Sequence, residues 1–126
     1  MIFGIGTDIV QIPRIERILE KYGNIFSTKI LCSTELQKLE LLPLDKHSNF
    51  LAKRFAAKEA ISKAFGIGIT KHNLHFKDIT ILNDNLGKPY TEINLNKLKD
   101  FGIFKINLSI SDDYPVAIAF AVITLL

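Results

Sequence analysis

The chain has 126 residues, a formal net charge of +3 and a hydrophobic fraction of 48%, which predict one folded domain over residues 1–126 with a sizeable core. The charge is small and no nucleic-acid-binding motif accompanies it, so we expect an anionic partner at a local patch and no nucleic acid. No apolar run can cross a bilayer and no signal peptide begins the chain, so we expect a cytoplasmic protein without a membrane partner. Cys32, the single cysteine, is expected to be an ordinary buried or half-buried thiol.

The first ten residues predict a β-strand in which Asp8 stands out. A carboxylate among isoleucine and valine needs a partner, and Asp8 lies too far ahead of Pro13 to cap the helix predicted over residues 12–22. Gly4 and Gly6 do not make a dinucleotide-binding loop, because the third glycine of that motif is missing.

The helix over residues 12–22 presents three basic side chains, Arg14, Arg17 and Lys21, at spacings of three and four residues, which places them on one face. On spacing alone an ordinary solvated face is the simpler interpretation. A loop or short turns follow as far as Ser33, where a short helix begins and runs to Leu39.

The helix predicted over residues 48–65 is apolar nearly all round, which is typical of a buried helix. Arg54 and Lys58 fall inside its apolar arc, and Glu59 and Lys63 lie beside it. One interpretation is a solvated Glu59–Lys63 pair with Arg54 and Lys58 extending to water. The other is a polar site at the core, which Asp8 favours, since two carboxylates flanked by cations suit a magnesium ion and a polyphosphate.

The rest of the chain predicts mostly strands. His72 and His75, in a linker over residues 70–76, are expected at the surface, since their spacing does not suit zinc. We predict a strand over 78–83, a turn over 83–87, a short extended piece after Pro89 and a helix over 94–99. Strands over 104–111 and 115–125 should form a hairpin. This order predicts an α+β fold, with helices packed on one face of a mainly antiparallel sheet. The segment from Val116 to Leu126 is apolar enough to need cover on both faces.

Two long motifs carry a resemblance to a known family. They are Gly6-Thr7-Asp8-Ile9-Val10 with Arg14-Ile15, and Arg54-Phe55-Ala56-Ala57-Lys58-Glu59-Ala60 with Lys63-Ala64-Phe65-Gly66. With Leu86-Gly87-Lys88-Pro89 and Leu108-Ser109-Ile110-Ser111, they resemble the signatures of the holo-[acyl-carrier-protein] synthases, the short bacterial-type 4′-phosphopantetheinyl transferases. The resemblance covers essentially the whole chain.

The resemblance implies the 4′-phosphopantetheinyl transferase fold and a homotrimer with active sites between subunits. It implies transfer of the 4′-phosphopantetheine group of coenzyme A to a serine of an acidic apo-acyl carrier protein, in fatty acid biosynthesis, with release of adenosine 3′,5′-bisphosphate. Asp8 and Glu59 would bind Mg²⁺, the expected cofactor.

Further site residues follow from the same resemblance. Arg54, Lys58 and Lys88 are candidates for phosphate contacts, and Ser111 for a further hydrogen bond. Lys63, one helical turn from Glu59, is expected to act either as the base that activates the serine or as an electrostatic clamp. The face of Arg14, Arg17 and Lys21 becomes the expected docking surface for the acidic carrier.

Asp112 departs from the family pattern, in which a histidine usually follows the serine of the last motif. A carboxylate at neutral pH cannot donate a hydrogen bond, and it would repel a diphosphate. Asp112 therefore turns away, has another role, or reduces activity, and the first is favoured because Asp112-Asp113-Tyr114-Pro115 has turn chemistry. The alternatives to an active transferase are a non-catalytic homologue that still binds coenzyme A or the carrier, and a structural module whose charged helix only makes ion pairs.

Overall fold

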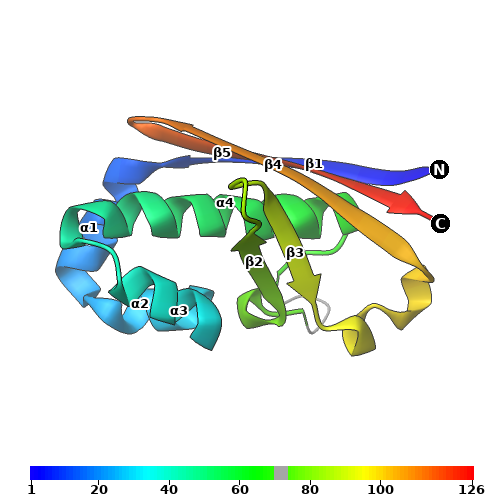
Figure 1. The fold of residues 1–126 in the computed structure, drawn as a ribbon, viewed down its shortest axis with the longest axis horizontal. Coiled ribbons are helices and arrows are strands. Elements are labelled where there is room, and N and C mark those ends of the chain that lie inside the picture. The colour runs from blue at the N-terminus through cyan, green and yellow to red at the C-terminus, as the bar shows by residue number, and fades with distance from the viewer. Residues whose placement is uncertain (70–73) are drawn as a thin grey trace.

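One long helix, α4 (His47–Phe65), runs through the middle of the molecule between two layers (Figure 1). The computed structural model describes residues 1–69 and 74–126. A three-stranded antiparallel sheet of β1 (Ile2–Gln11), β5 (Val116–Leu125) and β4 (Phe104–Asp113), in the order β1-β5-β4, covers one side of the helix. The expected antiparallel α+β fold with a long buried helix is therefore confirmed.

The layer on the other side of α4 consists of short elements (Figure 1). Three helices lie toward its N-terminal half: α1 (Ile12–Tyr22), α2 (Asn24–Ile30) and α3 (Ser33–Glu40). The hairpin of β2 (Ile79–Asn83) and β3 (Pro89–Ile93) lies beside them. Short 3-10 turns complete the chain at Leu44–Lys46, Phe76–Asp78, Leu95–Lys97 and Lys99–Phe101.

The two-sided cover explains why the α4 sequence is apolar nearly all round. Its fully buried residues are mostly small, so both layers approach the helix closely. They include Leu51, Ala52, Ala56, Ala57, Ala60 and Ile61. Gly66, with φ +78°, ends the helix in the left-handed conformation that glycine adopts without strain.

Strand β1 lies directly on α4 because two of its residues lack a side chain. A Cβ at Gly4 would collide with the carbonyl oxygen of Ala64, and one at Gly6 with that of Ala60. These glycines are required for close backbone approach, a reason that the sequence pattern did not reveal. The approach sets the position of Asp8, which follows on the same face of the strand.

The opposite face of the sheet has no cover from the described residues. In β5 the alanines that alternate with larger residues face α4, while Ile118 and Phe120 are 43% and 42% exposed. In β1, Ile5 and Ile9 are more than 60% exposed. Ile9 pairs with Ile118 across the strands, so these side chains form a continuous apolar surface.

Most predicted elements are confirmed, and two are corrected. The segment expected to be a loop before Ser33 contains helix α2, because Ile30 is buried and Phe26 packs against the core. The helix expected over 94–99 is instead two 3-10 turns, in which Leu98 is the buried anchor. So short a segment has too few buried apolar residues to stabilise an α-helix.

Three smaller expectations have different outcomes. Cys32 is a half-buried free thiol 3.3 Å from the hydroxyl of Thr80, as expected. His75 is exposed, as expected, whereas His72 lies outside the described residues. No helix within residues 1–69 and 74–126 has the length and apolar character needed to cross a membrane.

Candidate active site

Asp8, Glu59 and Lys63 come together where β1 crosses the C-terminal half of α4. The Lys63 ammonium lies 3.1 Å from Asp8 Oδ1 and donates a hydrogen bond of 3.0 Å to the carbonyl oxygen of Thr7. Lys63 is thus engaged with the strand, and no Glu59–Lys63 hydrogen bond or ion pair within 4 Å forms in the described part of the chain.

The electrostatics of Glu59 favour an added positive charge. Partial burial raises its pKa above the ordinary glutamate value, the negative charge of Asp8 raises it further, and Lys63 partly offsets both. Two carboxylates in mutual repulsion with one exposed lysine leave a local excess of negative charge. A divalent cation would relieve it.

The donor set of this cluster fits magnesium better than a metal that needs a protein cage. Among the described residues no group of three or more histidine, cysteine, aspartate or glutamate side chains could hold a metal. Magnesium keeps several waters and takes only one or two carboxylates, the remaining ligands coming from substrate phosphates. Asp8 and Glu59 satisfy that requirement.

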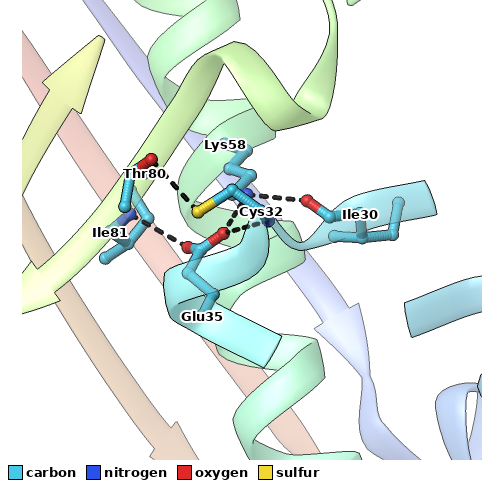
Figure 2. Close-up of polar contacts among 6 residues, drawn as sticks. All are labelled: Ile30, Cys32, Glu35, Lys58, Thr80 and Ile81. Carbon is cyan, nitrogen blue, oxygen red and sulfur yellow. Dashed lines mark hydrogen bonds and ion pairs between the residues drawn. The ribbon is translucent and has the colours of Figure 1, made fainter. Parts of the chain in front are cut away.

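Lys58 lies elsewhere, and its predicted phosphate contact is wrong. Its side chain has no exposed area, and its ammonium lies 2.6 Å from Glu35 Oε1 and 2.7 Å from the carbonyl oxygen of Ile30 (Figure 2). The Glu35 carboxylate also accepts hydrogen bonds from the backbone N–H groups of Cys32 and Ile81. The ammonium has two acceptors among the described residues and no exposed area, so Lys58 neither extends to water nor contacts a phosphate.

Arg54, one turn before Lys58, lines an open pocket of about 700 Å³. Its guanidinium lies over the ring of Phe50, 4.2 Å from the centroid, and donates a 2.9 Å hydrogen bond from Nη2 to Asn83 Oδ1. Its buried Nε has no hydrogen-bond partner among residues 1–69 and 74–126. Burial lowers the pKa of Arg54, against an opposing effect of Glu35, and the guanidinium stays charged at neutral pH.

This pocket, which we call the cationic pocket, is lined by four basic side chains and by no acidic one among the described residues: Lys38, Lys46, Lys53 and Arg54. Asn49 and Asn83 add amide groups. Such a lining suits a ligand that carries phosphates. Sequence reasoning missed Lys38, Lys46, Asn49 and Lys53, although the last three follow one another at spacings of three and four residues where the chain enters α4.

The remaining predicted phosphate contacts lie apart from the cationic pocket. Lys88 is exposed at the end of the β2–β3 turn and lines a different hollow of about 370 Å³ between β3 and β4. Ser111 is exposed near the end of β4, opposite Ile118. Neither residue is among those that line the cationic pocket.

Asp112 does not turn away from the rest of the protein. Its Oδ2 accepts a 2.8 Å hydrogen bond from the side-chain amide of Asn49, and its Oδ1 lies 3.6 Å from the Lys53 ammonium. Both partners line the cationic pocket. The carboxylate therefore joins the end of β4 to the start of α4 and neutralises part of the charge at the pocket rim.

The basic face of α1 is exposed as the spacing predicted, with Arg14, Arg17 and Lys21 all accessible. An apolar groove of about 240 Å³ lies on α1 and α2 and has a basic residue, Lys29, in its lining. The other residues that line it are Ile18, Tyr22, Ile25 and Phe26. A basic face next to an apolar groove suits a partner surface that is acidic and has apolar anchors.

The sequence and the fold are similar to those of known proteins. The chain is 49% identical over 130 residues to a holo-[acyl-carrier-protein] synthase of Orientia tsutsugamushi, over 98% of each chain. Its structure resembles that of the Neisseria meningitidis enzyme of the same name with a TM-score of 0.90 and 44% identity, over 99% of this chain and 100% of the other. It also resembles a Bacillus anthracis holo-(acyl-carrier-protein) synthase in complex with coenzyme A (3′,5′-ADP), with a TM-score of 0.84 and 39% identity over 98% and 96% of the two chains. Since the profile of the 4′-phosphopantetheinyl transferase superfamily also matches residues 4–119, this chain belongs to that superfamily.

Proposed function

We propose that this protein transfers the 4′-phosphopantetheine group of coenzyme A to a serine of apo-acyl carrier protein, as a holo-[acyl-carrier-protein] synthase. The cluster of Asp8, Glu59 and Lys63, in a chain that matches synthases over nearly its full length, carries the proposal. The related Bacillus anthracis protein was crystallised in complex with coenzyme A. The serine oxygen forms a new bond to the phosphorus that bears pantetheine and gives up its proton to water, while the diphosphate bond breaks and adenosine 3′,5′-bisphosphate leaves.

Asp8 and Glu59 would hold the magnesium ion, which when bound stabilises the negative charge of the diphosphate. The repulsion between these carboxylates supports this role, because a cation removes it. Arg54 would bind a phosphate of coenzyme A in the cationic pocket. Its buried guanidinium is already held by Asn83 and Phe50. The side chain therefore loses little further conformational entropy when the ligand binds.

Lys63 would stabilise the charge that develops on the diphosphate. Its ammonium donates hydrogen bonds to the Asp8 carboxylate and to the Thr7 carbonyl oxygen, so it already acts as a donor beside the carboxylates. This geometry favours the electrostatic clamp over the base. Lys63→Arg distinguishes the two roles, because arginine keeps the charge but does not accept a proton at neutral pH. Transfer by this variant at more than about a tenth of the wild-type rate would support the clamp, whereas a much larger loss would support the base.

The test of the function is a transfer assay with apo-acyl carrier protein, coenzyme A and magnesium chloride, read as the mass gain of the carrier by mass spectrometry. We expect one phosphopantetheine group per carrier, no reaction in EDTA, and no reaction with a carrier whose acceptor serine is alanine. Asp8→Asn and Glu59→Gln should reduce the rate by at least about a thousandfold, since each leaves one carboxylate for the metal. Full activity of either variant would contradict the metal assignment. Binding of coenzyme A without any transfer by the wild-type protein would instead support the non-catalytic alternative.

The carrier would dock on the basic face of α1, where Arg14, Arg17 and Lys21 are exposed. Arg14→Glu should raise the KM for the carrier by about tenfold and leave the Kd of coenzyme A unchanged, because a rim charge acts mainly on association. Added salt should reproduce the effect in the wild-type protein. Glu20→Arg, a charge reversal of equal size on the same helix, is the matched control and should not raise this KM. An effect of Arg14→Glu on coenzyme A binding alone would show that the docking face is misplaced.

We also propose that the protein forms a homotrimer whose active sites lie between subunits. The uncovered sheet face with Ile5, Ile9, Ile118 and Phe120 offers an apolar surface for a second copy. Within one chain, Arg54 and Lys63 are separated by nine residues of α4, or about 13 Å along the helix axis. The acidic cluster and the cationic pocket are thus at different places on one subunit, and a neighbouring subunit can bring them together.

Mixing two inactive variants tests this arrangement. Asp8→Asn and Arg54→Ala each damage one part of the site, so randomly mixed trimers should recover about a quarter of the wild-type activity, at sites that combine intact parts from two subunits. Sites contained within single chains would recover none. Light scattering should give the mass of three chains for the wild-type protein and a smaller species for Ile118→Lys.

The single domain and the cytoplasmic location stay predictions from the sequence.

A further inference from the structure

The ion pair of Glu35 and Lys58 has no part in the chemistry proposed above, yet it makes four hydrogen bonds among the described residues (Figure 2). Both side chains have no exposed area. Taking two charges out of water is costly, and a pair of apolar side chains of similar volume would often be as stable. A role beyond stability is therefore a reasonable expectation, and the hydrogen bonds indicate which one.

The pair fixes strand β2 on helix α4. Glu35 Oε2 accepts a 2.9 Å hydrogen bond from the backbone N–H of Ile81, while Lys58 holds the other carboxylate oxygen from α4. Two residues further along β2, the side chain of Asn83 accepts a hydrogen bond from Arg54, one turn earlier on α4. Arg54 and Lys58 lie about 6 Å apart along the axis of α4, so the two hydrogen-bonded groups attach β2 to the helix at two separate points.

The same carboxylate also acts on Arg54 through space. Burial lowers the pKa of Arg54, and the negative charge of Glu35 opposes that effect. For Lys58, burial again lowers the pKa most, Glu35 raises it, and the positive charge of Arg54 lowers it. Glu35 therefore stabilises two buried cations on one face of α4, and only Arg54 lines the pocket.

We propose that Glu35 and Lys58 are positioning residues that set the register of β2 on α4, so that Asn83 holds the Arg54 guanidinium in place for a phosphate of the ligand. The ligand class, a phosphate-bearing nucleotide such as coenzyme A, rests on the proposed function. The positioning itself rests on the hydrogen bonds from Ile81 to Glu35 and from Arg54 to Asn83.

The test replaces both charges at once, because removal of one partner would leave the other buried and unpaired. Glu35→Met/Lys58→Met removes the acceptor for the Ile81 N–H. Glu35→Gln/Lys58→Met removes the charges but keeps an amide oxygen as acceptor. The matched control is Lys97→Met, which removes the 2.8 Å contact with Asp78 just before the same hairpin; neither residue lines the cationic pocket. Circular dichroism must show that each variant is folded at the assay temperature.

Binding of coenzyme A, measured by calorimetry, should weaken by about tenfold in Glu35→Met/Lys58→Met, the size expected for a misplaced charge-assisted hydrogen bond. KM for coenzyme A should rise in parallel, with kcat changed by less than about threefold. Glu35→Gln/Lys58→Met should recover most of the affinity, and Lys97→Met should bind normally.

A double-mutant cycle with Arg54→Ala decides whether the pair acts through Arg54. We expect Arg54→Ala to weaken coenzyme A binding in the wild-type background and to cause little further loss in Glu35→Met/Lys58→Met. Additive losses, or wild-type affinity in the folded double variant, would overturn the proposal and leave the pair a purely structural element.

The position of Arg54 can also be measured without any ligand. In ¹⁵N–¹H spectra the Nε–H signal of Arg54 should move in Glu35→Met/Lys58→Met and return toward its original position in Glu35→Gln/Lys58→Met. An unchanged signal in both would refute the positioning role even if coenzyme A failed to bind the wild-type protein. Failure of coenzyme A to bind, with the signal moving as expected, would refute the proposed ligand and retain the positioning.

Discussion

Lys58 and Lys63 lie five residues apart on the same helix, and each contacts a carboxylate from a distant part of the chain. Lys58 lies 2.6 Å from Glu35, and neither side chain is exposed. Lys63 lies 3.1 Å from Asp8, with 53% of its own side chain and 16% of the aspartate exposed. The contacts are similar, but water and ligands reach only the second pair.

This difference in burial supports the different roles that we propose for these two residues of one motif. A fully buried ion pair cannot exchange its partner for a substrate, so it can only maintain structure and position. A partly exposed pair contributes little stability, and its members are free to exchange partners when an ion or a phosphate arrives. Both residues are lysines, so burial alone separates the one proposed to position Arg54 from the one proposed to act in catalysis.

The strongest test of this comparison is the loss of activity in Lys63→Met. We expect transfer to fall by at least about a hundredfold, because the variant lacks the charge beside the diphosphate. The free energy of unfolding should change by less than about 1 kcal/mol, as for other exposed pairs. Steady-state kinetics and urea unfolding measure the two quantities. Unfolding at much lower urea than the wild-type protein would contradict the view that this pair is dispensable for the fold.

Lys58→Met should give the opposite result, with a loss of about 3–5 kcal/mol in the free energy of unfolding because Glu35 is left buried without its counter-ion. Urea denaturation followed by circular dichroism measures the loss, with Lys63→Met as the control on the same helix. A variant of wild-type stability would mean that water reaches Glu35, and the two lysines would then differ less than their burial indicates.

Glu59→Gln should raise the Tm of the metal-free protein by about 1–3 °C at pH 7.5. The increase is small because water screens the repulsion at this partly exposed side chain. Burial and Asp8 raise the pKa of Glu59, so its ionised form destabilises the fold above that pKa. The penalty disappears as the pH falls below the unfolded-state value near 4.5, so the two Tm values should converge at pH 4. Thermal scans in EDTA across this range measure the effect. A lower Tm for the variant at pH 7.5 would show that Lys63 outweighs the repulsion.

The smallest effect is expected for Asp112→Asn at the rim of the cationic pocket. Its carboxylate lies 3.6 Å from the Lys53 ammonium, and both side chains are about one-third exposed. The free energy of unfolding should therefore change by less than about 1 kcal/mol. Removing one negative charge should lower the Kd of coenzyme A by about two- to threefold at low ionic strength, and salt should abolish the difference. Calorimetry at two salt concentrations measures this. Weaker binding would mean that Asp112 holds Lys53 in its binding position.

Local patterns in the sequence predicted most of the fold. The apolar circumference of residues 48–65 predicted a buried helix, and the turn chemistry of residues 112–115 predicted a hairpin of the last two strands, because both signals depend only on near neighbours in the chain. Helix α2 was missed because it has only seven residues, about two turns, which are too few to show a helical periodicity of apolar residues. Gly4 and Gly6 were noticed without their reason, since the helix that they touch lies more than 50 residues away.

For the site, the sequence by itself determined the residue types and the motif that contains Asp8, Glu59 and Lys63. Only the tertiary structure decided which charges pair. Lys58 finds its partner 23 residues away on α3, and Asp112 meets Asn49 across 63 residues. The cationic pocket likewise gathers side chains from α3, α4 and β2. Periodicity is a property of neighbours along the chain, whereas the cost and the partner of a buried charge are set by whatever the completed fold places around it.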